Sequence, residues 1–471
     1  MSTVAAAEIP RGQIFEYGAQ LPGESSKYFK DVELIARRLG YDYAQACQME
    51  ADVIGDSMVS SMLRRIAGSL SAGEDPSEFL AREAKAVAEE YGNHYERKLD
   101  TLKQWTDAYV ALVIAGVLVV IIAIVSTMIW QIQTSFILIL VGLTIGITVM
   151  GAWLISLMSP KETVTSKEPT SKEQKLAKKL FMALVPLAAV AGVMLIMMGA
   201  TAGYPLIVAG LLVFPVGFVS ALDDKKISRR DADVATLLRS LGGVATAIGS
   251  TVGEALGRID LRSVESLMTN SKRLLVRLQS GIKSKLCWDR FVEETGSVVV
   301  SRSVGMFRDA LDLGAEPEEV GKRASAYATT VSTLRSKRKM ISKPFSWLTF
   351  VMHAAVAMLL VFIVEVMTKF GSVIQTMEEE IKDPGSVSAS APSMTSYFSF
   401  HFAGLELLNT LVLPVLLVLT VVNALAPKIA DGGHNYKILQ NLGITMVISG
   451  LCFVVVPVLT EMIFGVAAMG G

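Results

Sequence analysis

The residues that could support catalysis are few, and they lack the partners that catalysis needs. Gly321-Lys322-Arg323 resembles the end of a phosphate-binding loop. That loop also needs a glycine at position 316 and a Ser or Thr after the lysine, where this chain has Glu316 and Arg323. No G-x-S-x-G or H-E-x-x-H motif is present. We therefore predict no catalytic residues, no ATP hydrolysis by this chain and no enzymatic activity.

Residue types that bind metals are scattered along the chain. Cys47, Cys287 and Cys452 show no C-x-x-C spacing, and His434 has no Cys or His close by in the sequence. We predict no metal site, no cofactor and no disulfide framework, with the cysteines acting as small buried apolar groups. The formal net charge is zero, so composition gives no reason to expect nucleic-acid binding.

Charged residues beside long apolar stretches could instead bind a partner. One basic group precedes the stretch that starts at residue 345 and comprises Arg335, Lys337, Arg338 and Lys339. It could contact an acidic protein face or anionic lipid headgroups, and membrane topology alone would also explain it. Asp431-Gly432-Gly433-His434 lies in a short loop whose two glycines allow a tight turn. A plain turn and a contact with another domain or protein both fit this loop.

Three acids, Glu365, Glu406 and Glu461, lie inside apolar stretches near their ends. Acids at membrane depth usually face protein or water. Hydration at the interface and contact with another transmembrane segment therefore both remain open. His353 lies deeper in its stretch, and we expect it to make a hydrogen bond between helices.

The elements that position these residues are membrane-spanning helices. A helix needs about 20 mostly apolar residues to cross a bilayer. Seven stretches reach that length: 108–130, 136–158, 180–199, 204–222, 345–367, 403–426 and 442–464. We therefore predict an all-α, polytopic membrane protein with about seven transmembrane helices and two repeated cytoplasmic helical-bundle domains.

Lys and Arg near the ends of the spans predict the orientation, because cytoplasmic loops are rich in them. Residues 159–179 hold six lysines, and residues 223–343 hold 22 Lys and Arg. This pattern predicts a cytoplasmic N-terminus and an extracellular C-terminus. The predicted parts are an N-terminal tail (1–25), a first cytoplasmic helical domain (26–106), four spans with a Lys-rich loop (107–222, loop 159–179), a second cytoplasmic domain (223–344), a fifth span (345–367), an irregular outer loop (368–402) and two last spans with the C-terminus (403–471).

The two cytoplasmic domains contain an internal repeat. LSAGEDPSEFLAR begins at Leu70 and LDLGAEPEEVGKR begins at Leu311, an offset of 241 residues. In each copy a helix should end at the glycine, and the next helix should begin at the proline. A span follows each copy, so the order of the elements indicates a duplication. Residues 1–106 carry 12 basic and 17 acidic groups, whereas residues 223–344 carry 22 and 15.

The repeat and the spans together resemble the type II secretion system F domain family, and most closely its archaeal flagellar (archaellum) assembly branch. The matching stretches include SAGEDPSEFLAREA, CWDRFVEETGSVVVSR, MFRDALDLGAEPEEVG and KIADGGHNYK. The seven spans, with an added block at 136–222, point to the archaeal branch. Platforms of archaeal adhesive pili or secretion systems remain an alternative, and a membrane transporter is a more distant one.

The resemblance implies a platform protein in the cytoplasmic membrane beneath a growing filament. A hexameric ATPase of the secretion superfamily would dock on its cytoplasmic domains, and archaellin or pilin-like subunits would contact its spans. A homodimer fits the family, and membrane lipids are expected partners of the basic residues beside the spans. The candidate ATPase contacts are Arg82, Arg323, Arg335, Lys337, Arg338, Lys339, Asp431 and His434. The candidate filament contacts are Glu365, Glu406 and Glu461.

Overall fold

A computed structural model describes residues 1–21, 25–55, 57–129, 134–164, 171–382 and 403–469 of the chain. At some helix ends (127–129, 134, 373–382, 403–409 and 464–469) it describes the backbone alone. The described residues form helices and no strands. The predicted all-α fold is therefore confirmed.

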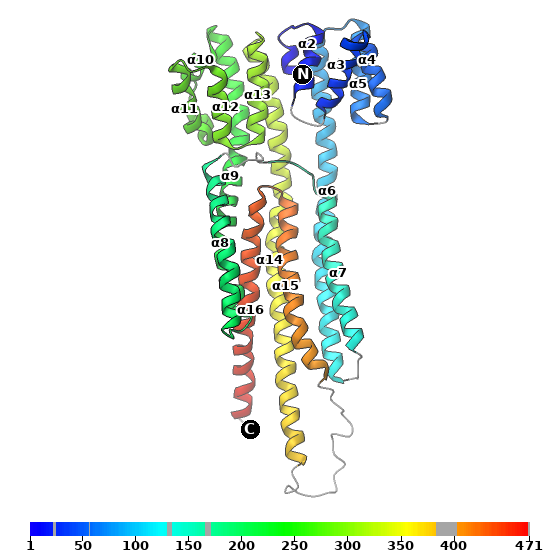
Figure 1. Cartoon of the computed structure of the whole chain (residues 1–471), viewed down its shortest axis with the longest axis vertical. Helices are drawn as coiled ribbons and strands as arrows, with labels where there is room; N and C mark the ends of the chain where they lie inside the picture. Colours follow the sequence, from blue (N-terminus) through cyan, green and yellow to red (C-terminus); the bar gives the residue numbers. More distant parts are fainter. Residues whose placement is uncertain (22–24, 56, 130–133, 165–170, 383–402, 470–471) are drawn as a thin grey trace. The chain divides into compact units, whose positions relative to one another are not determined.

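The short helices come first in the chain and again in its middle (Figure 1). They are α1 (Ser2–Ala5), α2 (Arg11–Gln20), α3 (Ser26–Leu39), α4 (Tyr43–Ile54), α5 (Met58–Ala72), α10 (Val252–Arg258), the 3-10 helix η1 (Leu261–Leu267), α11 (Met268–Gln279), α12 (Ser284–Thr295) and α13 (Val298–Asp312). The long helices are α6 (Pro76–Ile129), α7 (Thr134–Met158), α8 (Lys172–Met197), α9 (Gly203–Ile248), α14 (Pro317–Lys382), α15 (Ala403–Asp431) and α16 (Ile438–Met469), with a short 3-10 turn, η3 (Asn435–Lys437), before α16.

The seven long helices are apolar and long enough to cross a membrane, among the residues that the structure describes. Each overlaps one predicted span. Three of them, α6, α9 and α14, continue well beyond the span as a single helix. The chain is thus a polytopic membrane protein, as its sequence indicates.

The predicted irregular loop at 368–402 differs from the structure in its first part. Helix α14 continues to Lys382, and residues 383–402 lie outside the described part. The physical reason is local: between Gly371 and Pro384 the chain contains no helix breaker, and Met, Glu, Gln, Ile and Lys favour helix there.

The chain divides into two compact units. Unit 1 comprises Met1–Glu96, Thr163–Lys172 and Lys225–Ser336. Unit 2 comprises Arg97–Glu162, Glu173–Asp224 and Lys337–Gly471. The short helices belong to unit 1, and the predicted spans belong to unit 2, with α6, α9 and α14 shared between the two units.

Unit 1 contains the repeat, and the repeat is longer than its sequence motif. Helices α2, α3, α4, α5 and α6 correspond in order to α10, α11, α12, α13 and α14. After a shift of 241 positions, the starts of corresponding helices agree to within one residue. The Gly and Pro positions of the motif lie where the sequence predicts, because α6 begins at Pro76 and α14 begins at Pro317.

Three pairs of glycines separate the repeated helices. Gly40, Gly55 and Gly73 have φ of 77°, 77° and 72°, and their equivalents Gly281, Gly296 and Gly314 have φ of 72°, 66° and 88°. Only glycine adopts these left-handed angles without a steric cost. Both copies therefore place glycine with a positive φ at the same turn positions, although ψ differs between Gly55 (−153°) and Gly296 (8°).

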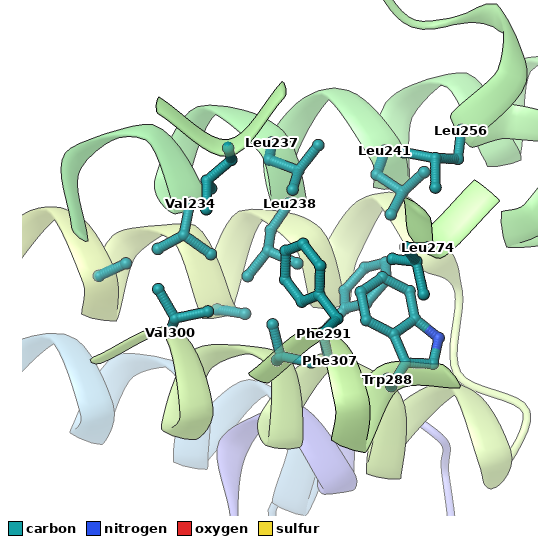
Figure 2. Close-up of a cluster of buried hydrophobic side chains, with 14 of the residues drawn as sticks. Val234, Leu237, Leu238, Leu241, Leu256, Leu274, Trp288, Phe291, Val300 and Phe307 are labelled. Atoms are coloured by element: carbon teal, nitrogen blue, oxygen red, sulfur yellow. The ribbon is translucent and has the colours of Figure 1, made fainter. Parts of the chain in front are cut away.

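The hydrophobic cores of the two copies differ. The first is built from Phe15, Phe29 and small residues such as Cys47 and Ala51. Figure 2 shows the second, in which Trp288, Phe291 and Phe307 pack beside leucines of α9. The rings of Trp288 and Phe291 meet edge to face, with centroids 5.8 Å apart. Aromatic side chains bury more apolar area than the small residues of the first core.

Unit 2 contains a glycine seam between α9 and α16. Gly203 and Gly210 of α9 lie directly against Gly450 and Gly443 of α16, and Gly217 lies against Gln440. A Cβ built at Gly203 or Gly210 would lie 2.7 or 2.9 Å from a backbone carbonyl oxygen of α16. Glycine therefore permits the close approach of these two helices, as is common between membrane helices.

A buried polar chain crosses the apolar part of unit 2. The Tyr109 hydroxyl donates to Asn423 Oδ1 at 2.7 Å, and Asn423 Nδ2 lies 3.1 Å from His353 Nδ1. The other ring nitrogen of His353 lies 2.9 Å from Ser449 Oγ. The expected helix-to-helix hydrogen bond of His353 is confirmed, and the chain joins α6, α14, α15 and α16.

Candidate functional site

The candidate site in unit 2 is a loop between α15 and α16 whose sequence forces a tight turn. Helix α15 ends at Asp431, and Gly432 and Gly433 follow with φ of 75° and 73°. A Cβ at Gly433 would lie 2.1 Å from an oxygen of Asp224, and one at Gly432 would lie 2.9 Å from the guanidinium of Arg338. Both glycines are therefore required by backbone angle and by space.

Arg338 fastens this loop from α14. It is 5% exposed. Its Nε donates to Ala430 O at 2.8 Å, and Nη2 donates to Ile429 O at 2.9 Å. These carbonyls belong to the last turn of α15, where no backbone N–H remains to pair with them and where the helix dipole favours a cation.

The same guanidinium reaches the chain after α7. Its Nη1 donates to Pro160 O at 2.9 Å, and Nη2 donates to Ser159 Oγ at 2.5 Å. Ser159 in turn donates to Ile429 O at 2.8 Å. One arginine therefore holds the ends of two transmembrane helices, a task that the fixed fork of five donors suits.

Asp224 of α9 also binds this loop. Its carboxylate accepts the backbone N–H of His434 at 3.0 Å, and Ser220 Oγ lies 2.8 Å from His434 Nδ1. Asp431 accepts a hydrogen bond from Ser342 at 2.7 Å and pairs with Lys437. Lys437 Nζ also lies 3.8 Å from Asp224. Lys437 thus lies beside both acids and supplies the opposite charge that buried carboxylates require.

Burial lowers the pKa of His434 below its ordinary value of 6.5. The nearby Asp223 opposes this shift, and Lys428 adds to it. The ring is half-buried and accepts the Tyr436 N–H at 3.2 Å through Nδ1. His434 therefore acts in this loop as a neutral cap for η3.

Arg335 lies in unit 1 and is also engaged within the protein. Its Nη1 donates to Asp231 at 2.6 Å, with the Asp231 side chain only 1% exposed. Nη2 donates to Thr163 O at 3.2 Å. Asp231 also accepts the hydroxyl proton of Ser297, which caps α13 by accepting the N–H groups of Val299 and Val300. Arg335 thus supports a helix start within unit 1.

The two lysines of the basic stretch differ from the two arginines. Lys337 is exposed, and Lys339 is half-buried. Lys337 is therefore accessible to solvent, and the guanidinium groups of Arg335 and Arg338 are buried against backbone and side-chain groups of their own units. The sequence gives four adjacent cations, and the structure separates them into supporting and accessible ones.

The repeated arginines also have different surroundings. Arg82 is 62% exposed and pairs with Glu74. Its equivalent Arg323 is 15% exposed and pairs with Glu319 at 2.9 Å. Arg323 also donates to Ser2 O at 2.5 Å and to Ser77 Oγ at 3.3 Å. It therefore joins the second copy to the start of the first, where α1 packs on α13.

The structure describes the side chains of two of the three candidate filament contacts. Glu365 of α14 is half-buried, and Glu461 of α16 is exposed. The side chain of Glu406 lies outside the described part of the structure. The structure shows no hydrogen-bonded cluster between Glu365 and Glu461.

Sequence reasoning missed the acids and hydroxyls that hold these cations. Asp224 and Asp231 are 3% and 1% exposed, and Ser159 and Ser342 are 7% and 0% exposed. One signal was available for the acids: Asp223-Asp224 follows an apolar span directly, where unpaired acids would be unfavourable. The serines give no such signal, because serine is common in loops.

The arrangement supports mechanical connection more than chemistry. Among the described residues no group of three or more His, Cys, Asp or Glu side chains is placed to hold a metal ion. The buried donors and acceptors of the loop are directed at helix ends. The network can therefore hold α7, α9, α14 and α15 in register with the turn before α16.

Comparisons with known proteins agree with this architecture. No protein-family model matches the chain, and no solved structure matches it. The flagella accessory protein J of Methanocaldococcus jannaschii is 21% identical over 468 residues, covering 94% of this chain and 80% of that protein. The protein of the same name from Methanococcus voltae is 22% identical over 457 residues, covering 94% of this chain and 78% of that protein. The resemblance to archaellum assembly platform proteins is therefore confirmed, by homologues named flagella accessory protein J that align with nearly the whole chain.

Proposed function

We propose that this chain is the cytoplasmic-membrane platform of an archaellum, and that it couples a hexameric secretion ATPase to the assembly of archaellin subunits. The observation that carries this proposal is the repeated helical bundle whose last helix continues into a span in both copies, as α6 and α14. The similarity to flagella accessory protein J supports the filament type. The chain itself acts as a scaffold and not as an enzyme.

The orientation of the chain is part of the proposal. Unit 1 lies in the cytoplasm, together with the loop from Asp431 to His434, and the C-terminus lies outside the cell. The basic residues of segments 159–179 and 223–343 support this orientation. A homodimer would present two copies of unit 1 to one ATPase ring.

The proposed ATPase contacts divide into two roles. Lys337 and Arg82 are exposed and can meet an acidic ATPase face directly. Arg335, Arg338 and Arg323 are mostly buried and would act by holding the helices that carry such contacts. Lys339, Asp431 and His434 would act through the loop in the same way. Glu365, Glu406 and Glu461 are the proposed contacts with subunit transmembrane segments.

Co-purification with the ATPase tests this proposal. The full-length protein in detergent should retain a secretion-superfamily ATPase and stimulate its ATP hydrolysis. The charge reversal Lys337→Glu should weaken retention by about tenfold, because it replaces attraction with repulsion at an exposed contact. Lys272→Glu is the matched control, since Lys272 is also exposed and lies on α11.

Two results would count against the platform role. One is that the intact protein retains no such ATPase under any nucleotide condition. The other is that the protein moves a solute across liposomes, which would favour a transporter. Equal loss of retention in Lys337→Glu and Lys272→Glu would reject the specific contact while leaving the platform role in place.

A further inference from the structure

A basic cavity in unit 1 is not used by the proposed function. It is lined on one side by Lys226, Arg229, Arg230 and Asp233 of α9, and on the other by Arg262, Ser263, Glu265 and Ser266 of η1. Its volume is about 680 Å³. Lys226, Arg229, Arg230 and Asp233 follow the three- and four-residue spacing of one helix face, so the cations of α9 share a wall of the cavity.

The two walls are fixed to each other. Asp233 accepts the backbone N–H of Ser266 at 2.9 Å and its hydroxyl at 2.6 Å. Val264 and Leu267, between the lining residues of η1, are 1% and 0% exposed in the core of the second copy. These two buried residues, three positions apart, hold the segment on the core, and Arg262 and Ser263 are exposed.

The charge inside the cavity favours an anion. Lys226 and three arginines line the cavity against two acids, Asp233 and Glu265, so four positive and two negative charges give a formal net charge of +2. Arg230 is held in place by donating to Thr295 O at 2.7 Å. Arg229 and Arg262 are exposed, and the structure shows no ion pair for either guanidinium among the described residues. Both serine hydroxyls of the lining donate within the protein, Ser263 to Asp260 O and Ser266 to Asp233, so the guanidinium groups are the donors that suit a phosphate group.

The position along α9 selects the source of the phosphate. The predicted fourth span ends at residue 222 on this same helix, and each helical residue advances about 1.5 Å. Lys226, Arg229 and Arg230 thus stand about 6 to 12 Å beyond the end of the span. The headgroup layer extends roughly 5 to 8 Å beyond the hydrocarbon core, and long basic side chains can reach back toward it.

We propose that this cavity binds the phosphate of an anionic membrane lipid, with Arg229 and Arg262 as its principal ligands and Lys226 and Arg230 completing the positive lining. The site would tie the second copy of the repeat to the membrane surface. This inference is independent of ATPase docking, and it concerns different residues from those proposed to contact the ATPase.

Native mass spectrometry of the full-length protein tests the site. The protein in detergent is titrated with phosphatidylglycerol and, separately, with the zwitterionic lipid phosphatidylcholine. The double variant Arg229→Gln/Arg262→Gln should bind phosphatidylglycerol about tenfold more weakly than the unmodified protein, since each basic residue at an anionic surface adds to the affinity. Phosphatidylcholine binding should stay unchanged.

A matched variant separates a specific site from general charge. Lys272→Gln/Lys285→Gln removes the same charge from two exposed residues of the second copy that do not line the cavity. It should retain the phosphatidylglycerol affinity of the unmodified protein. Equal weakening in both double variants, or none in either, would overturn the proposal. Displacement of the lipid by millimolar glycerol phosphate at equal affinity would also overturn it, because the ligand would then be a soluble phosphate.

Discussion

The two copies of the repeat share their turn positions and differ in the residues of their hydrophobic cores. Gly40, Gly55 and Gly73 match Gly281, Gly296 and Gly314 in position and in having a positive φ. Inside, Cys47 and Glu50 of the first copy stand where Trp288 and Phe291 stand in the second. Backbone geometry therefore limits the turn positions to glycine, whereas core positions can exchange small, acidic and aromatic residues if neighbouring side chains repack.

The outer contacts of the copies differ in the same way. Arg82 pairs with Glu74 at the surface, while Arg323 is enclosed and binds Ser2 and Ser77. The second copy also gains α1 on its surface, with Ala6 and Ala7 packed against its core. We therefore expect the second copy to be the more stable one, and the first to yield more readily to a partner.

Truncation of the aromatic core should have the largest effect. Phe291→Ala should destabilise the second copy by about 3–5 kcal/mol, the usual cost of replacing a fully buried phenylalanine with alanine. Hydrogen–deuterium exchange of the full-length protein should show faster exchange in α11, α12 and α13. The equivalent change Glu50→Ala should leave α3, α4 and α5 nearly unaltered. A larger effect from Glu50→Ala than from Phe291→Ala would reverse the predicted order of stability.

Arg323→Ala should have the next largest effect. It removes several hydrogen bonds of a mostly buried cation, which contribute about 1.5–3 kcal/mol when the acceptors are left unpaired. Exchange should increase in α1 and at the start of α14. Arg82→Ala should change exchange in α6 by at most about 1 kcal/mol, because it breaks only an exposed ion pair. Similar losses in both variants would remove the proposed difference between the copies.

Substitution of the turn glycines should affect both copies equally. Gly40→Ala and Gly281→Ala each force alanine to a positive φ, at a cost of about 1–2 kcal/mol. Gly305→Ala is the control, because Gly305 is inside α13 with open space around it, and alanine should stabilise the helix by about 0.5–1 kcal/mol. Exchange at the helix ends beside each turn measures these changes. A cost confined to one copy would show that the shared turns do not carry equal strain.

The smallest expected difference between the copies is in how their stability depends on pH. Burial, aided by the charge of Asp31, raises the pKa of Glu50 above 4.5. The folded first copy therefore binds a proton more readily than the unfolded chain, so its stability falls as pH rises from 4.5 through that raised pKa. The protection factors of α4 amides, which correct for the intrinsic slowing of exchange in acid, should rise on acidification toward pH 5. Glu50→Gln should abolish this change, and α12, with Phe291 at the equivalent position, should show none.

The number of spans, the repeat and the helix ends at Gly73 and Gly314 could be predicted from the sequence alone. Apolar length and the left-handed requirement of glycine are local properties, so they can be read without knowing what packs where. The sequence also singled out the Asp431–His434 loop and the basic stretch around Arg338. It gave no distinction among the four cations of that stretch, because charge and spacing are the same for a solvated residue and a buried one.

Which of these charged residues support helices and which are exposed to solvent depends on the tertiary structure. Arg338 is enclosed because the carbonyls of α15 and the chain after α7, distant in sequence, converge on its guanidinium. Arg335 is enclosed because Asp231 lies one side chain away, although 104 positions separate them. The basic cavity beside η1 depends on the same kind of convergence. The helical character of residues 368–382 follows from local helix propensity, which the composition of the whole predicted loop concealed. The physical reason is that burial is a property of the whole packed chain, while turn geometry is a property of a few neighbouring residues.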